Sequence, residues 1–473
     1  MNHLKAGMIF TTIGVYSNFI LQIIINAVLS RLLTPQDYGV VAIMQVFIVF
    51  FAMMIESGMG PAIIQNKKLS QEDVRVLFNF SAIFAVSIAV IFGLFGYFLA
   101  WLYHQDIYKS LTWVQAISVL FNGLNIVPSA ILNKSKKFKH VNFSMVFANV
   151  CAGIIGVSLA FLGFGVYSLI ISAIIFSIIN FLLNLYFTKL RFSSKFYIEP
   201  LRSIWTFSKN QFGFNFINYF SRNTDNILVG KFMGEAALAN YGKAYQLLML
   251  PNSLFLGVIT PVLQPVLSDY QDDVVYIREV YYKVVHVLAL IGVPLSVFLS
   301  LSADKIILFM FGSQWGEAVI PFSILALTVW IQMTLSSSGA IFQARNQSKV
   351  LFVTGFISAI ILVTSISIGV AMGSIVSVAI CLSIGFLLNF IVSFYRLITI
   401  TLQGNIFSFL KVFISPLLLG VMMFIALKVV QFIEPSAVFL NLIVRGITFL
   451  VVIVVYIWST KEKIVIKQIL EKN

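Results

Sequence analysis

Long apolar runs are the feature that most limits what this chain can fold into. Hydrophobic residues make up 60% of its 473 residues and charged residues only 10%, and the mean hydropathy is +0.98. A soluble domain of this composition would lack the polar residues that solvate a surface, whereas a run of about 20 apolar residues is long enough to cross a bilayer as a helix. The sequence therefore predicts an all-α polytopic membrane protein.

Runs of this length predict about fourteen transmembrane helices. They are expected near 8–30, 40–64, 77–102, 112–132, 142–162, 165–187, 208–230, 237–267, 282–300, 318–342, 349–368, 373–395, 408–428 and 437–458. An even number of spans leaves both termini on one side of the membrane. With the termini in the cytoplasm, every inner loop between spans carries more Lys and Arg than either outer neighbour, as the positive-inside rule requires.

This asymmetry also explains the formal net charge of +14. In a soluble protein such a charge would suggest nucleic acid as a partner, but here most of it marks the cytoplasmic rim, where it would attract anionic lipid headgroups. We expect no nucleic-acid partner. Cys151 and Cys381 both lie within predicted spans without CxxC spacing, so neither a disulfide nor a metal site is expected.

The two halves of the chain repeat each other at an offset of about 200 residues. Pro61-Ala-Ile-Ile-Gln65 at the end of one span matches Pro261-Val-Leu-Gln264 at the end of another, and Tyr38-Gly39 matches Tyr241-Gly242. A repeat of six spans keeps its orientation, so the halves would be related by an axis along the membrane normal. We expect two pseudo-symmetric six-helix lobes plus two further C-terminal helices.

The predicted domains follow from this repeat. They are an N-terminal lobe at 1–190, a cytoplasmic interfacial linker at 191–207, a C-terminal lobe at 208–397, and two additional helices with a basic cytoplasmic tail at 398–473. The linker mixes cations with apolar residues such as Phe192 and Tyr197, which is typical of a segment lying at a membrane surface.

Six polar side chains interrupt the span at 208–230 and define its candidate site. They are Gln211, Asn215, Asn218, Arg222, Asp225 and Asn226, and they fall within an arc of about 100° on a helix. An Arg at the centre of a membrane helix costs about 2.5–3.5 kcal/mol, so this stripe is expected to face protein or a water-filled cavity. Arg222 suits an anionic, phosphate-bearing ligand, and Asp225 either orients it or takes up a coupling H⁺ or Na⁺. A structural ion pair between the two is the alternative.

Further polar residues in other spans extend this prediction. Asn18, Gln22 and Asn26 share one face of the first span, where each either lines the cavity or links neighbouring helices. Lys243 is a candidate ligand, with snorkelling to the interface as the alternative. Glu56 is expected to be a rim residue at the end of a helix, with a proton site as the alternative. Arg445 is expected to snorkel or to contact lipid phosphate.

Enzyme chemistry has little support in the sequence. The four His are scattered, the outer loops are short, and no Walker A loop is present, so we expect a transporter that needs no cofactor or metal. A membrane-bound glycan polymerase or ligase would require a long outer loop.

The first two spans and residues 221–273 resemble one known family. SRLLTPQDYGVVAIMQVF, ESGMGPAIIQ, SRNTDNILVGKFMGEAALANYGKAYQLLMLP and PVLQPVLSDYQDD are similar to segments of the polysaccharide transporter family. These are the lipid-linked oligosaccharide flippases of bacterial O-antigen, capsule and exopolysaccharide export, in a superfamily that also holds the lipid II flippase and the multidrug and toxin extruders.

The resemblance implies a two-lobed, alternating-access flippase in the bacterial inner membrane. Its substrate would be an undecaprenyl-pyrophosphate-linked glycan, with membrane lipids and a polysaccharide polymerase as further partners. The pyrophosphate would lie in a cationic cavity. The lipid II flippase uses several Arg in its first two spans, whereas the first span here offers amides, which suits contact with sugar. The alternative within the superfamily is a multidrug or small-cation antiporter, which would need acidic residues in the N-terminal lobe, where Glu56 is the sole candidate.

Overall fold

The computed structural model describes residues 2–56, 59–66, 69–202, 223–433, 435–460 and 462. Within these ranges the regular structure is helical, without a strand. The chain divides into two compact units, Met1–Ala236 and Ala237–Asn473. Ten helices among the described residues are long and apolar enough to cross a membrane, or eleven if one bent pair forms a single span. A polytopic all-α fold is therefore confirmed, while the count of fourteen stays a prediction.

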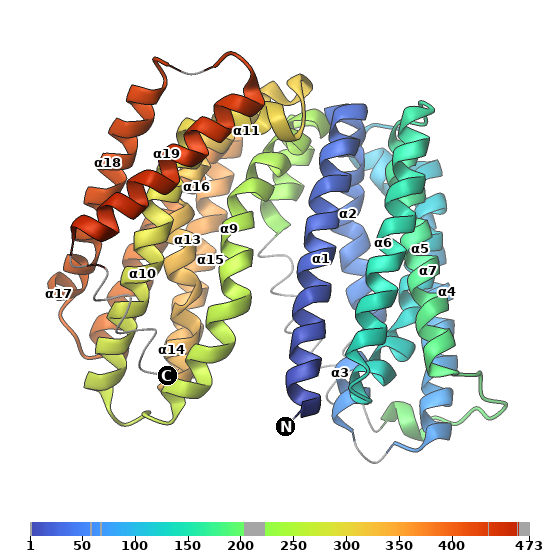
Figure 1. Ribbon diagram of the computed structural model, residues 1–473. Helices are drawn as coiled ribbons and strands as arrows, with labels where there is room; N and C mark the ends of the chain where they lie inside the picture. Colours follow the sequence, from blue (N-terminus) through green and yellow to red (C-terminus); the bar gives the residue numbers. More distant parts are fainter. Residues whose placement is uncertain are drawn as a thin grey trace. The chain divides into compact units, whose positions relative to one another are not determined.

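The first unit is built from long helices that run side by side (Figure 1). They are α1 (Asn2–Leu32), α2 (Pro35–Glu56), α3 (Met59–Gln65), α4 (Gln71–Tyr103), α5 (Ile107–Lys134), α6 (Phe138–Phe161) and α7 (Val166–Thr188). Their contacts pair α4 with α5, α6 with α7, α5 with α7 and α1 with α6. Then α9 (Glu235–Ser268) begins at the last residues of this unit and continues into the second.

Local sequence signals set the ends and the spacing of these helices. Ser70 caps α4 by accepting a hydrogen bond from the backbone N–H of Asp73, whose carboxylate accepts in return from the Ser70 N–H at 2.8 Å. Further along α4, a Cβ at Gly96 would lie 1.9 Å from Oγ1 of Thr112 on α5. The close α4–α5 packing therefore depends on a residue without a side chain at position 96.

The segment after α7 lies along the first turns of α4. Asn79 exchanges two hydrogen bonds with the backbone of Ser193, at 2.9 and 3.1 Å, and Tyr197 donates to Asp73 at 2.8 Å. Phe192 stacks on Phe78 yet keeps 63% of its surface exposed. The described part of the predicted linker is thus tied to the first unit by polar contacts while its phenylalanine side chains remain exposed.

The second unit contains the remaining elements. They are α10 (Val274–Leu301), α11 (Ala303–Met310), η1 (Ser313–Ala318), α12 (Val319–Ala326), α13 (Val329–Ser336), α14 (Ser338–Ala344), α15 (Ser348–Ala371), α16 (Ile375–Arg396), η2 (Leu397–Thr401), α17 (Ile406–Leu410), η3 (Lys411–Phe413), α18 (Ile414–Val430) and α19 (Val438–Ser459). The span predicted at 318–342 is broken, because Ser313–Ala326 and Val329–Ala344 meet at a bend of 53°. Ser296 of α10 accepts from the Trp330 N–H at 3.0 Å, which satisfies a backbone donor freed by the break.

Helices α18 and α19 pack on the rest of the second unit through polar as well as apolar contacts. Arg445 of α19 is 3% exposed and donates to the carbonyl of Leu301 and to Ser302 Oγ, which end α10. The expectation that Arg445 snorkels or contacts lipid phosphate is therefore wrong. The guanidinium instead satisfies one carbonyl and one hydroxyl at a helix C-terminus, where the helix dipole favours a cation.

Candidate functional site

The stripe predicted on the span at 208–230 lies mostly outside the described residues. This applies to Gln211, Asn215, Asn218 and Arg222. Asp225 is described and 6% exposed, and its Oδ1 accepts a hydrogen bond from the backbone N–H of Asn226 at 2.8 Å. Asn226 is half-buried. A ligand-binding role for this stripe stays a prediction.

The amides predicted on the first span have different surroundings from one another. Asn18 accepts a hydrogen bond from Asn149 of α6, so it links two helices. Asn26 accepts from Ser30 Oγ at 3.2 Å on its own helix, and Gln22 is exposed. These amides were expected either to line a cavity or to link neighbouring helices, and Asn18 links neighbouring helices.

Lys243 is buried in the second unit beneath aromatic rings. It is 4% exposed, and its Nζ lies 4.6 Å from the ring centroid of Phe311 and 5.0 Å from that of Trp315. These distances allow cation–π attraction on both rings. The side chain of Lys243 therefore does not snorkel toward the membrane interface, which was the alternative to its role as a ligand.

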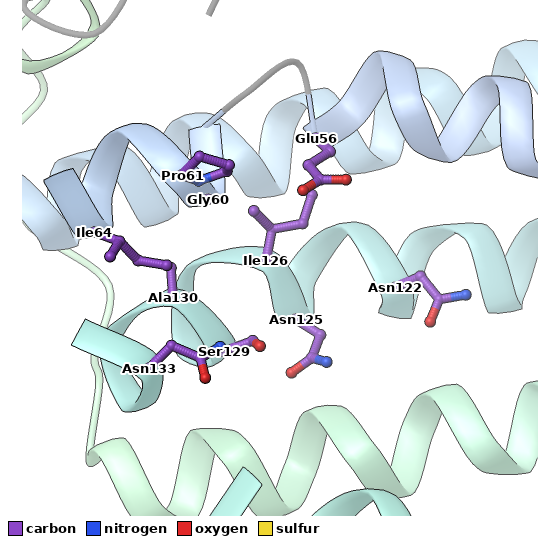
Figure 2. Close-up of a pocket in the computed structure, with 10 residues that line it drawn as sticks. All are labelled: Glu56, Gly60, Pro61, Ile64, Asn122, Asn125, Ile126, Ser129, Ala130 and Asn133. Carbon is purple, nitrogen blue, oxygen red and sulfur yellow. The ribbon is translucent and has the colours of Figure 1, made fainter. Parts of the chain in front are cut away.

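A polar cavity of about 310 Å³ opens in the first unit between α2, α3 and α5. Figure 2 shows Glu56 and Pro61 on one wall and the asparagines of α5 on the other. The residues that line it are Glu56, Gly60, Pro61, Ile64, Asn122, Asn125, Ile126, Ser129, Ala130 and Asn133. Its volume falls at the lower end of the range of small-ligand sites. Glu56, the last described residue of α2 before 59, lines this cavity, and its expected position at a helix end stays a prediction.

The polar wall comes from one face of α5. Its members are Gln115, Ser118, Asn122, Asn125, Ser129 and Asn133, at spacings of three or four residues. Such spacing keeps side chains on a single helical face. Gln115 and Ser118 are buried, at 4% and 2% exposure, and the four members that follow them line the cavity.

Hydrogen bonds from α7 hold part of this wall in place. Asn184 is 1% exposed and donates from Nδ2 to Asn125 Oδ1 at 2.9 Å. Asn122 donates to Ser118 Oγ at 3.3 Å along α5 itself. Because Asn125 uses its carbonyl oxygen for Asn184, its Nδ2 group is left to donate toward the cavity.

Several cavity groups make no hydrogen bond to the described part of the protein. These are the carboxylate of Glu56, the hydroxyl of Ser129, the amide of Asn133 and Nδ2 of Asn125. Polar groups that converge on a cavity without protein partners are available to water or to a ligand. The set is neutral except for Glu56, so it suits hydroxyl-rich ligands and repels phosphate.

The polar face of α5 was not predicted as a site, although the spacing of its polar residues is visible in the sequence. The α5 stripe has the same spacing as the predicted stripe at 211–226 and is longer. It lacks a charged residue, which is what drew attention to the other stripe. Glu56 lies on a different helix, so only the fold brings it opposite Asn125 and Asn133.

Two helical units with many membrane-length helices, one of them holding a polar cavity, define a polytopic membrane protein. The fold is similar to that of the lipid II flippase MurJ in an inward closed conformation, with a TM-score of 0.76 and 15% identity over 97% of this chain and 100% of that one. It is also similar to an inward-facing multidrug resistance MATE family transporter, with a TM-score of 0.62 and 15% identity over 80% of this chain and 93% of that one.

Residues 28–320 match the family model described as polysaccharide biosynthesis protein, and the chain belongs to this family. It is 23% identical to the teichuronic acid biosynthesis protein TuaB of Bacillus subtilis, over 89% of this chain and 88% of that protein. It is 24% identical to the succinoglycan biosynthesis transport protein ExoT of Rhizobium meliloti, over 77% and 74%. It is 20% identical to the lipopolysaccharide biosynthesis protein WzxC of Escherichia coli, over 78% and 76%. The family suggested by the sequence is confirmed.

Proposed function

We propose that this protein is a flippase that moves undecaprenyl-pyrophosphate-linked oligosaccharide units across the bacterial inner membrane by alternating access. Its family and relatives support a role in polysaccharide biosynthesis, since those relatives are named for teichuronic acid, succinoglycan and lipopolysaccharide. The fold it shares with a lipid II flippase supports a lipid-linked substrate. Both termini would lie in the cytoplasm, and a polysaccharide polymerase would receive the product.

The observation that carries the glycan part of this proposal is the cavity of the first unit. Asn125, Ser129 and Asn133 offer amide and hydroxyl groups without protein partners among the described residues. Neutral groups of this kind pair with sugar hydroxyls, while Pro61 and Ile126 provide an apolar surface for the C–H face of a pyranose ring.

The charge of Glu56 separates the role of this cavity from that of the polar stripe predicted at 211–226. A carboxylate in the wall disfavours a pyrophosphate in the same cavity, because like charges repel at short range. The pyrophosphate would then be held elsewhere, and Arg222 is the residue predicted for it. In this scheme the first unit contacts sugar and the polar stripe at 211–226 contacts the anionic group.

Export of surface glycan in a strain lacking the chromosomal gene tests the sugar contact. Asn133→Ala and Ser129→Ala each remove a group that makes no protein hydrogen bond, so the fold should tolerate them. Losing one hydrogen bond of about 0.5–1.5 kcal/mol predicts an affinity loss of roughly two- to tenfold. Ser110→Ala is the control, because Ser110 is an exposed residue on the same helix.

Filling the cavity gives a second, steric arm of the same experiment. A Cβ at Gly60 would lie 3.8 Å from Glu56 Oε1 and 3.9 Å from Ile126, which is ordinary contact. Gly60→Ala should therefore export normally, whereas Gly60→Leu should block export and leave lipid-linked units in the cytoplasmic leaflet. Normal export by Gly60→Leu and Asn133→Ala at wild-type protein levels would rule out this cavity as a glycan site.

The presence of Glu56 in the cavity favours one alternative function, a cation antiporter. A carboxylate in the N-terminal half is the feature expected of such a protein. Drug susceptibility distinguishes the two functions, because an antiporter should confer resistance that Glu56→Gln abolishes while surface glycan stays unchanged. A flippase should confer no drug resistance, and Glu56→Gln should change the surface glycan instead.

A further inference from the structure

Glu235 is a buried carboxylate in the first unit, and none of the ion pairs found among the described residues involves it. It is 7% exposed and is the first residue of α9. Its Oε1 accepts from Tyr108 Oη at 3.1 Å, and its Oε2 accepts from Gln105 Nε2 at 2.9 Å and from Gln36 Nε2 at 3.5 Å. All of these donors are neutral.

Burying a charge without a counter-ion is costly, and neutral donors offset that cost only in part. The same neutral groups are also able to hydrogen-bond to the protonated carboxylic acid. A carboxamide that turns over presents oxygen in place of nitrogen, so Gln105 and Gln36 are able to accept a hydrogen bond from a carboxylic acid. The Tyr108 hydroxyl also both donates and accepts. An Arg or Lys in their place would favour the ionised carboxylate alone.

The backbone of Glu235, like its side chain, packs closely against neighbouring residues of the first unit. A Cβ at Gly39 would lie 2.0 Å from the carbonyl oxygen of Glu235, so α2 touches the first turn of α9 directly. Gly234 precedes this turn with φ of 85°, a conformation that glycine adopts without strain. The residues after Ala236 belong to the second unit. Glu235 therefore holds the last residues of the first unit against α2 and α5.

Other charged or titratable groups of the surrounding elements are engaged elsewhere or exposed. Lys231 donates to the Leu102 carbonyl, with its Nζ 6.0 Å from the centre of the Tyr103 ring. Asp37 of α2 accepts from Thr34 at 2.7 Å. Further titratable groups at these helix ends are the half-buried phenol of Tyr103, on which the charge of Glu235 acts, the exposed Arg31 and His104, and the exposed Asp106–Lys109 ion pair. None of them forms an ion pair with Glu235 among the described residues.

We propose that Glu235 is a proton-binding site whose protonation loosens the first turn of α9 from α2 and α5. Glu235 lies between the spans predicted at 208–230 and 237–267, a connection that the positive-inside rule assigns to the outer face. The proton would then be exchanged with the outer side. Adding it replaces a carboxylate that accepts three hydrogen bonds by an acid that donates one, so either one amide has to turn over or the Tyr108 hydroxyl has to rotate and accept. Coupling this step to transport rests on the proposed flippase function, but proton binding does not.

Infrared difference spectra of the purified full-length protein, recorded over a pH titration, test the site without transport. The wild type should show the C=O stretching band of a carboxylic acid on acidification, and Glu235→Gln should lose that band. Asp106→Asn, which removes a nearby exposed carboxylate, should keep it. An unchanged band in Glu235→Gln would overturn the proposal.

Tyr108→Phe keeps the test decisive if Glu235→Gln does not fold. It removes one donor to the ionised carboxylate, so the band should appear at higher pH than in the wild type. A band that does not move would also count against the site. Protection of the first-turn amides of α9 against hydrogen exchange, corrected for the intrinsic pH dependence of amide exchange, should fall on acidification in the wild type and stay independent of pH in Glu235→Gln.

Glycan export separates the two proposals. Export by the wild type should change with external pH, and export by Glu235→Gln should not. If the wild type exports no glycan but retains the infrared band and its pH-dependent exchange, the flippase function fails while the proton site stands. If export by Glu235→Gln keeps the wild-type dependence on pH, the coupling role is wrong.

Discussion

The imidazole of His286 lies between two acceptors, with Nε2 2.7 Å from Glu462 Oε2 and Nδ1 2.8 Å from the Val412 carbonyl oxygen. A neutral imidazole donates through one nitrogen only. Both hydrogen bonds therefore form if the ring is an imidazolium that donates twice, or if Glu462 carries a proton and donates to Nε2. Glu462 also accepts from Ser415 Oγ at 2.5 Å. This pair ties the segment after α19 to α10 and α18.

Breaking this pair should destabilise the second unit. Both side chains are largely buried, with 16% and 10% exposure, so removing one partner leaves an uncompensated group and should cost about 3 kcal/mol. We expect His286→Ala and Glu462→Ala each to lower the unfolding temperature of the purified protein. The double variant should lose less than the sum of the two. Additive losses would show that the residues do not interact.

Arg445 should stabilise the packing of α19 against the end of α10. Arg445→Met keeps the length of the side chain but leaves the Leu301 carbonyl without its charged donor, at an expected cost of about 1.5–3 kcal/mol. Thermal unfolding measures this loss. Lys428→Met is the control, because Lys428 at the end of α18 is exposed and should change stability little. Equal effects of the two substitutions would contradict the buried role of Arg445.

Gly39 should not tolerate even a methyl group. Alanine at this position would place its Cβ against the backbone of Glu235, which has no side-chain rotamer to yield, so we expect a loss of at least about 1–3 kcal/mol. The same change at Gly355, where a Cβ would meet nothing within 4 Å, should be neutral or stabilising. Unfolding of the purified variants compares them, and a stable Gly39→Ala protein would contradict the close approach.

Docking of the segment after α7 should weaken at alkaline pH. The hydrogen bond that Tyr197 donates to Asp73 raises the pKa of the phenol, because it stabilises the neutral form. The stability contributed by this contact is therefore complete below the ordinary tyrosine pKa of about 10 and is lost as the pH rises through the raised pKa. Phenolate absorbance, compared between wild type and Tyr197→Phe, isolates this titration. Asp73→Asn should move it to lower pH, and an unmoved titration would refute the contact.

Arg222 is the residue that the sequence alone predicts to bind the pyrophosphate. Arg222→Ala should abolish export of surface glycan, and Arg222→Lys should restore it only in part, since an ammonium lacks the bidentate fork. Arg191→Ala, in the exposed segment after α7, should export normally. Undiminished export by Arg222→Ala at normal protein level would remove the proposed phosphate role.

The sequence by itself determined the class of fold and the family. Apolar runs near 20 residues specify membrane-length helices because the bilayer imposes that length on any spanning helix. The motifs around Gly39 and 221–273 pointed to the family that the match over residues 28–320 shows. Both signals are local in sequence, so they are readable without a structure.

Only the tertiary structure decided what each polar side chain meets. Asn18 links α1 to α6, Arg445 caps α10, and Lys243 lies beneath Phe311 and Trp315, although more than one role was compatible with each of them in the sequence. The environment of a buried polar group is set by neighbours that are distant in the chain, as Glu56 and Asn133 are across the cavity of the first unit. Helical periodicity places such a residue on a face, and packing alone determines what that face contacts.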